Sequence, residues 1–134
     1  MLIYQKTFSL IMEKTILKYN LEDRLVKLAC LCLEICDLLP NTRSANNLEY
    51  QLSKSGTAPA LLYGEAQAAE SRADFIHKMK IALKELRETR INLRIIKEKP
   101  IITNEKLQSV LLEVNQLIAI FSSSISTAKK NQFS

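Results

Sequence analysis

The chain has 134 residues, of which 47% are hydrophobic and 25% charged, and its formal net charge is +5. This length suits a single domain that buries its core without disulfides or metal, and only 2 Gly and 3 Pro exclude a turn-rich β-fold. No stretch has the roughly 18 consecutive apolar residues that cross a bilayer, and charged residues interrupt any export signal. We therefore expect one cytoplasmic all-α domain without a membrane partner.

The first 20 residues contain apolar and aromatic side chains without a clean helical period or cap, namely Tyr4, Phe8, Ile11, Ile16 and Tyr19. Three arrangements of residues 1–20 stay open: a short preceding helix, an arm that packs on another subunit, or a poorly ordered leader. The helical bundle is expected over residues 21–128, and residues 129–134 are expected to form a frayed tail.

A first helix is predicted over residues 21–39, where apolar side chains recur at steps of three and four: Leu25, Leu28, Cys32, Ile35 and Leu39. Pro40 and the polar residues after it supply the break. The three cysteines, Cys30, Cys32 and Cys36, all lie in this helix, where they are poorly placed to bridge one another, and their odd number suits a reducing compartment. We expect Cys32 and Cys36 to face the core rather than to bind a metal.

A second helix is predicted over residues 45–70, although Gly56, Pro59 and Gly64 lie within it. A proline in a helix interior costs about 3 kcal/mol because it removes a donor and clashes with the preceding turn. The pattern therefore predicts a kink or a short interruption near residues 55–59. The small residues there allow a neighbouring helix to approach closely.

A third helix is predicted over residues 72–98, because Ser71-Arg72-Ala73-Asp74 matches a capping box and a heptad seam follows it. The seam consists of Phe75, Met79, Ala82, Leu86, Thr89, Leu93 and Ile96. After Pro100, a cap at Thr103 or Asn104 predicts a fourth helix over residues 104–128. Several apolar residues lie off the main seams and suggest a partner subunit: Ile81, Ile91, Ile95, Leu112 and Ile120.

No set of residues predicts catalysis, a metal site or a cofactor. His77 is the only histidine, and it has neither an obvious nucleophile nor other metal ligands nearby in the sequence. A surface or interface hydrogen bond is the simpler role for it. We therefore expect a protein that is not an enzyme.

Charge is concentrated in the third predicted helix. Residues 70–99 contain nine Lys or Arg against five Asp or Glu, which leaves +4 of the net charge in this segment. Lys80, Lys84, Arg87 and Arg94 fall close to one helical stripe, a pattern that favours contact with the phosphates of RNA or DNA. The competing interpretation is that these charges form pairs along the helix and only solvate it.

The chain resembles the four-helix-bundle proteins of the 23S rRNA intervening sequence protein family. The resemblance covers about residues 25–125 and is densest in four segments: 51–57 (QLSKSGT), 64–71 (GEAQAAES), 74–78 (DFIHK) and 80–89 (KIALKELRET). It implies an antiparallel up-down four-helix bundle that assembles into a ring-shaped homopentamer. The sequence departs from the family at Leu62, where relatives often have asparagine.

Two functions follow from these observations. The first is a self-assembling scaffold or interaction module that binds a protein partner, in keeping with the many relatives that have no assigned task. The alternative is a nucleic-acid-binding accessory protein that uses the basic stripe. The resemblance supports this alternative, because some relatives are encoded inside ribosomal RNA genes and a similar protein is an accessory subunit of a reverse transcriptase.

Overall fold

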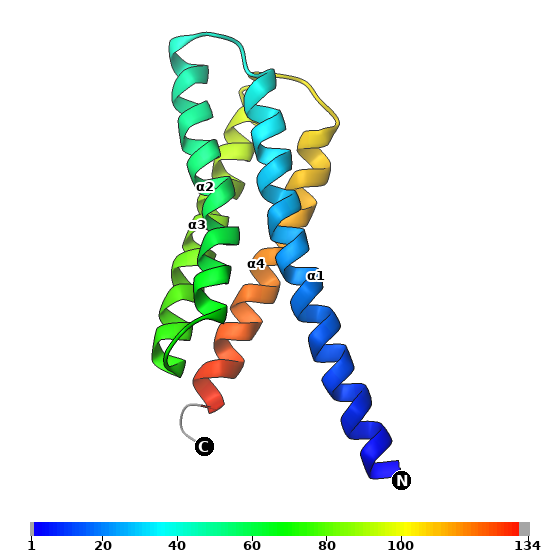
Figure 1. The fold of residues 1–134 in the computed structure, drawn as a ribbon. Coiled ribbons are helices and arrows are strands. Elements are labelled where there is room, and N and C mark those ends of the chain that lie inside the picture. The colour runs from blue at the N-terminus through cyan, green and yellow to red at the C-terminus, as the bar shows by residue number, and fades with distance from the viewer. Residues whose placement is uncertain (1, 132–134) are drawn as a thin grey trace.

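The computed structural model describes the backbone of residues 2–131 and the side chains of residues 20–131. Within these residues it contains four α-helices and no strand: α1 (Leu2–Leu38), α2 (Arg43–Gln67), α3 (Arg72–Glu98) and α4 (Lys106–Asn131). Each helix contacts the next one along the chain, and α4 also contacts α1. The connections α1–α2 and α3–α4 lie at one end of the bundle, and the α2–α3 connection lies at the other (Figure 1).

The predicted seams form the core that these four helices enclose. Four of the five seam residues predicted for the first helix are buried in α1, namely Leu25, Leu28, Cys32 and Ile35, whereas Leu39 is half-buried and follows the end of the helix. Six of the seven α3 seam residues are buried as well, and only Phe75 is half-buried. Phe121 of α4 meets Tyr63 of α2 edge to face, with ring centroids 6.1 Å apart. The apolar spacing of the sequence therefore identified the inward faces of α1 and α3.

The ends of the helices match the predicted caps closely. The Ser71 hydroxyl accepts a hydrogen bond from the backbone N–H of Asp74 at 3.0 Å, so α3 begins where the capping box predicts. Thr42 caps α2 in the same way, through the N–H of Ala45. The helix α4 begins at Lys106, two residues later than predicted, and the Asn104 side chain accepts the Lys106 N–H at 2.8 Å.

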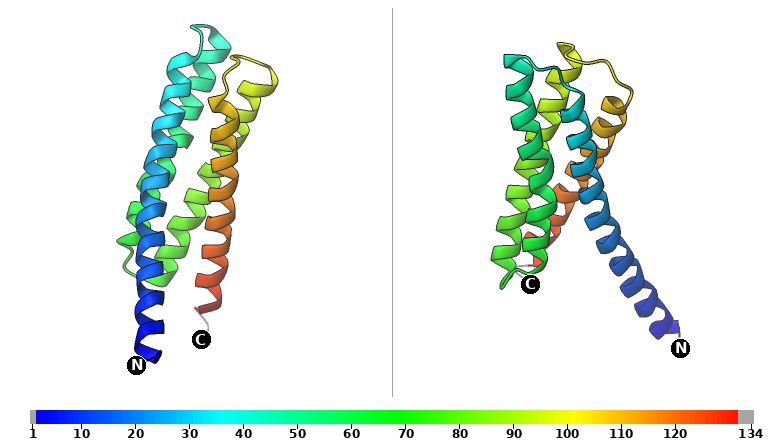
Figure 2. Two further views of the ribbon diagram at one scale, coloured as in Figure 1. Left: turned by 90° about the vertical axis from the view of Figure 1, so that its right-hand side faces the viewer. Right: turned by 45° about the horizontal axis from the view of Figure 1, so that its top comes forward.

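The sequence left the structure of residues 1–20 open, and residues 2–20 of this segment belong to α1. The helix begins at Leu2 instead of residue 21, and its N-terminal half diverges from the other three helices (Figures 1 and 2). The residue that precedes α1 lies outside the described part of the chain. At the other end, α4 continues to Asn131, so the first residues of the predicted tail are helical, and residues 132–134 lie outside the described part.

The predicted interruption of α2 does not occur. The helix runs unbroken from Arg43 to Gln67 with Pro59 inside it. Pro59 is buried, and α2 packs against both α1 and α3, so tertiary contacts offset the hydrogen bond that the proline removes. Gly56 shows how close the α1 contact is, because a Cβ atom built on it would lie 2.6 Å from the Cβ of Cys32. The close approach predicted from the small residues is confirmed.

By length and composition alone, α4 is the one described helix that could cross a membrane, with a mean hydropathy of 1.3 over its most apolar window. In the bundle, the apolar side chains of α4 form part of the protein core. Val110, Val114, Leu117 and Phe121 are fully buried against the other helices. A helix that supplies this much of a protein core passes the same test of composition.

Candidate functional site

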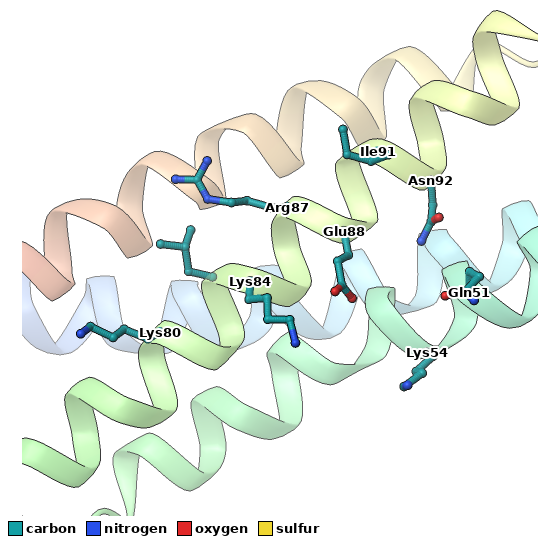
Figure 3. A pocket seen from close by; sticks show the side chains of 9 residues that line it. Gln51, Lys54, Lys80, Lys84, Arg87, Glu88, Ile91 and Asn92 are labelled. Carbon is teal, nitrogen blue, oxygen red and sulfur yellow. The ribbon is translucent and has the colours of Figure 1, made fainter.

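The outer face of α3 and the neighbouring side of α2 form an open groove of about 610 Å³. Three of the four residues predicted to contact phosphates lie in it: Lys80, Lys84 and Arg87. Figure 3 shows Lys84, Glu88 and Asn92 pointing from α3 toward α2. The remaining lining residues are Gln51 and Lys54 of α2 with Leu83 and Ile91 of α3.

The register of α3 follows from the contacts that hold it against α2. Its seam residues point into the core, so the steps of four and three from Lys80 to Lys84 and Arg87 turn these side chains outward. Beside the groove, the Asn92 amide donates a hydrogen bond to the hydroxyl of Ser55 at 3.1 Å, and this hydroxyl belongs to a residue only 2% exposed. Lys78 forms an ion pair with Glu65 at 3.5 Å. These contacts fix the position of α3 relative to α2, and the basic side chains extend outward from this helix pair.

The fourth predicted residue, Arg94, lies elsewhere. It lines a smaller groove of about 330 Å³ between α3 and α4, together with Arg90, Lys97 and residues of α4. Its Nε atom also donates to Glu98 at 3.1 Å, which forms an ion pair one turn along the helix. The structure thus brings together three residues of the predicted stripe and separates the fourth.

Two further lysines join the basic surface, and the sequence stripe did not include them. Lys54 enters the groove from α2. Lys129 of α4 lies beside Lys80, and the proximity of this second positive charge lowers the pKa of Lys129. Both lysines are far from the stripe along the sequence, so no local pattern could have predicted that they adjoin it.

Acidic groups also lie at the groove. Glu88 lines it, and one carboxylate oxygen of Glu85 is buried without a hydrogen-bond partner among the described residues. Burial raises the pKa of Glu85 most, the nearby Glu88 raises it further, and Lys84 and Lys54 oppose the shift. The surface can therefore attract an anion, but it is not uniformly positive.

The cysteines have environments that suppress thiol chemistry. Burial raises the pKa of Cys32 to about 12 and is also the main cause that raises the pKa of Cys36 to about 11. Thiols with such values stay protonated near neutral pH, and the protonated form is a poor nucleophile. Cys30 is exposed, and all three are free. Within the described part of the chain, no cluster of three or more His, Cys, Asp or Glu side chains could hold a metal ion.

Large apolar side chains remain on the outside of every helix. Of the five residues predicted to lie off the seams, Ile91, Ile95 and Leu112 are exposed, whereas Ile81 and Ile120 are half-buried. The pattern did not single out five other exposed apolar residues: Val26, Leu33, Leu38, Tyr50 and Leu61. A monomer that leaves this much apolar surface in water has surface available for a partner.

Comparison with known proteins places this bundle in a family. A crystal structure of a protein with unknown function, from the S23 ribosomal protein family of Bacteroides thetaiotaomicron VPI-5482, is similar to it with a TM-score of 0.74. The two chains are 29% identical, and the similarity covers 81% of this chain and 97% of the other. No curated protein matches the sequence. Residues 18–123 match the model of the family described as "23S rRNA-intervening sequence protein", and the chain belongs to this family.

Proposed function

We propose that the protein is a cytoplasmic, non-enzymatic scaffold, an antiparallel up-down bundle that assembles into a ring-shaped homo-oligomer. The observation that carries this proposal is the large exposed apolar side chains, which occur on all four helices and not on one face alone. Burying such surface against further copies stabilises an assembly through the hydrophobic effect. A pentamer is favoured because of the family to which the chain belongs. A protein partner then binds the assembled ring at several equivalent positions.

Light scattering across micromolar concentrations tests self-assembly directly. We expect a mass that is a multiple of the 15.3 kDa protomer and that persists on dilution. Changing Leu61, Ile95 or Leu112 singly to Ser should show which helix faces lie in the contact. A mass of one protomer at every concentration would refute the proposal.

A second function is favoured by the basic groove, namely binding of RNA or DNA through phosphates. Lys54, Lys80, Lys84 and Arg87 line one groove, and Lys129 adjoins Lys80. Cationic side chains that neutralise phosphates release condensed counterions, so binding of this kind is tolerant of sequence and weakens steeply with salt. An accessory role beside a nucleic-acid enzyme would use this surface.

Fluorescence anisotropy with labelled RNA and duplex DNA at two salt concentrations tests this second function. Changing Lys54, Lys80, Lys84 and Arg87 to Gln should abolish binding, whereas Arg94→Gln should have a smaller effect because Arg94 lies outside the groove. The matched control removes four positive charges elsewhere, at Lys27, Arg43, Lys99 and Lys130. Equal losses of affinity in the groove variant and the control would show that nucleic acid is attracted only by the net charge. No binding by the unchanged protein would exclude this second function and leave the scaffold function as the remaining proposal.

A further inference from the structure

One side of α1 is an acidic band, defined as Glu22, Asp23, Val26, Cys30, Leu33 and Asp37. All six residues are exposed, and although the exposed Lys27 lies on the same side of the helix, acidic groups outnumber basic ones there. They share the outer side of the helix because Leu25, Leu28, Cys32 and Ile35 turn the opposite side into the core. Val26 and Leu33, which are 51% and 43% exposed, lie within this band two helical turns apart. The surface is therefore apolar at its middle and negative at its ends.

The outer side of α3 is a basic band, defined as Lys80, Lys84, Arg87, Ile91, Arg94 and Ile95, and it has the exposed acids Glu88 and Glu98 beside it. It also contains two exposed apolar side chains, Ile91 at 46% and Ile95 at 45%. At a rise of 1.5 Å per residue, the acidic band is about 22 Å long and the basic band about 22 Å. The two bands thus match in length, oppose each other in charge, and both combine charged with apolar groups.

The bands cannot meet within one chain. No contact joins the described residues of α1 and α3, which occupy diagonal positions with α2 and α4 between them. Both bands face away from the core, so they lie on opposite sides of the bundle. Apart from the Arg94–Glu98 pair, no charged side chain of either band forms an ion pair within the described part of the monomer, and the complement of each band is present on every other copy.

From this charge complementarity we propose that the acidic band of one copy docks on the basic band of the next copy. The inference rests on the proposed self-assembly and identifies its interface. The contact is heterologous, because two different surfaces meet, and a series of such contacts closes into a ring if the rotation between copies allows it. Val26 and Leu33 would pack near Ile91 and Ile95, while the carboxylates and the basic side chains steer the encounter and fix the orientation.

This interface has a consequence for the basic groove. Lys80, Lys84 and Arg87 belong to both the groove and the basic band, so a docked copy covers them. Assembly and nucleic-acid binding through these three residues would then compete for one surface. An RNA or DNA that binds α3 should dissociate the assembly.

The test is a charge exchange monitored by light scattering. The acidic-band variant carries Glu22→Lys, Asp23→Lys and Asp37→Lys, and the basic-band variant carries Lys80→Glu, Lys84→Glu and Arg87→Glu. Each variant alone places like charges across the contact, so the concentration needed for assembly should rise about tenfold or more. Combining all six changes in one chain restores opposite charges at every contact and should restore assembly, whereas mixing the two variants can pair every contact only in a ring with an even number of copies. The matched control, with Glu49, Glu70 and Glu105 changed to Lys, should assemble like the unchanged protein.

Circular dichroism establishes that each variant keeps its helices, and the milder changes of the same residues to Gln replace any variant that does not. A second readout is alkylation of Cys30, which lies in the acidic band and should slow on assembly. An unchanged protein that is monomeric would overturn the self-assembly and this interface together. An assembly that neither reversal weakens would overturn the interface alone. Loss of assembly only in the basic-band variant would also overturn the proposed interface. If this variant lost RNA binding as well, the basic band would be assigned to nucleic-acid binding.

Discussion

The contact between Gly56 and Cys32 makes Gly56→Ala the sharpest test of how α1 and α2 pack. The added Cβ would lie 2.6 Å from the Cβ and 2.7 Å from the Sγ of Cys32. Carbon atoms in favourable contact are about 3.5–4.0 Å apart, so the two helices would have to separate by roughly 1 Å. A change of rotamer cannot relieve the clash, because each Cβ is attached directly to its backbone. Cys32 is also fully buried, so no empty space lies beside it.

Two effects of opposite sign determine how much Gly56→Ala changes the free energy of unfolding. Overpacking a core costs about 1–3 kcal/mol, and a clash between atoms fixed to two backbones belongs at the upper end of that range. Alanine has a helix propensity about 1 kcal/mol better than that of glycine, which offsets part of this cost. We expect Gly56→Ala to lower the free energy of unfolding by about 2 kcal/mol, which for a chain of this size lowers the melting temperature by roughly 6–10 °C.

Gly64 provides the matched control in the same helix. A Cβ on Gly64 would meet no atom within 4 Å, so Gly64→Ala should gain only the helix propensity and raise stability by up to about 1 kcal/mol. Combining Gly56→Ala with Cys32→Gly removes the clashing side chain and should cost less than the two single changes added together. The measurement is urea and thermal unfolding at one protein concentration. If Gly56→Ala were as stable as Gly64→Ala, the close approach of α1 and α2 described here would be wrong.

Three other predictions concern the cysteines, Glu85 and the ion pair between α1 and α4. Native protein at pH 8 should react with iodoacetamide at Cys30 only, and at all three cysteines in denaturant, as mass spectrometry would show; rapid native labelling of the other two would contradict their burial. The raised pKa of Glu85 means that the folded state holds its proton more tightly than the unfolded state, so its contribution to stability falls as pH rises above the unfolded value. In urea titrations, the free energy of unfolding of Glu85→Gln should therefore rise relative to that of the unchanged protein between pH 4 and pH 7. A difference in free energy that stays constant over this range would refute the raised pKa of Glu85. Arg24 donates to both carboxylate oxygens of Glu113, at 3.1 and 2.6 Å, and joins α1 to α4. Arg24→Gln should cost about 1 kcal/mol, and a double-mutant cycle with Glu113→Gln that shows no coupling would contradict this bond.

Much of the fold could be predicted from the sequence because the deciding information is local. The steps of three and four that define Leu25, Leu28 and Cys32 as a seam hold in any helix, whatever packs against it. The cap at Ser71 depends only on the residues that follow it within one turn. Charge density is local as well, so the sequence located the basic character of α3 and placed Lys80, Lys84 and Arg87 on its outer side.

Other features were decided only by the tertiary structure. Pro59 predicts a break by its own chemistry, yet α2 stays helical because two neighbouring helices pack along it. Arg94 shares the α3 stripe but lies at a different groove, since the stripe turns toward α4 over that distance and Glu98 pairs with it. Lys54 and Lys129 join the basic surface from other helices. The rotation of each helix about its axis and the identity of its neighbours depend on how all four seams pack together, which no single stretch of sequence contains.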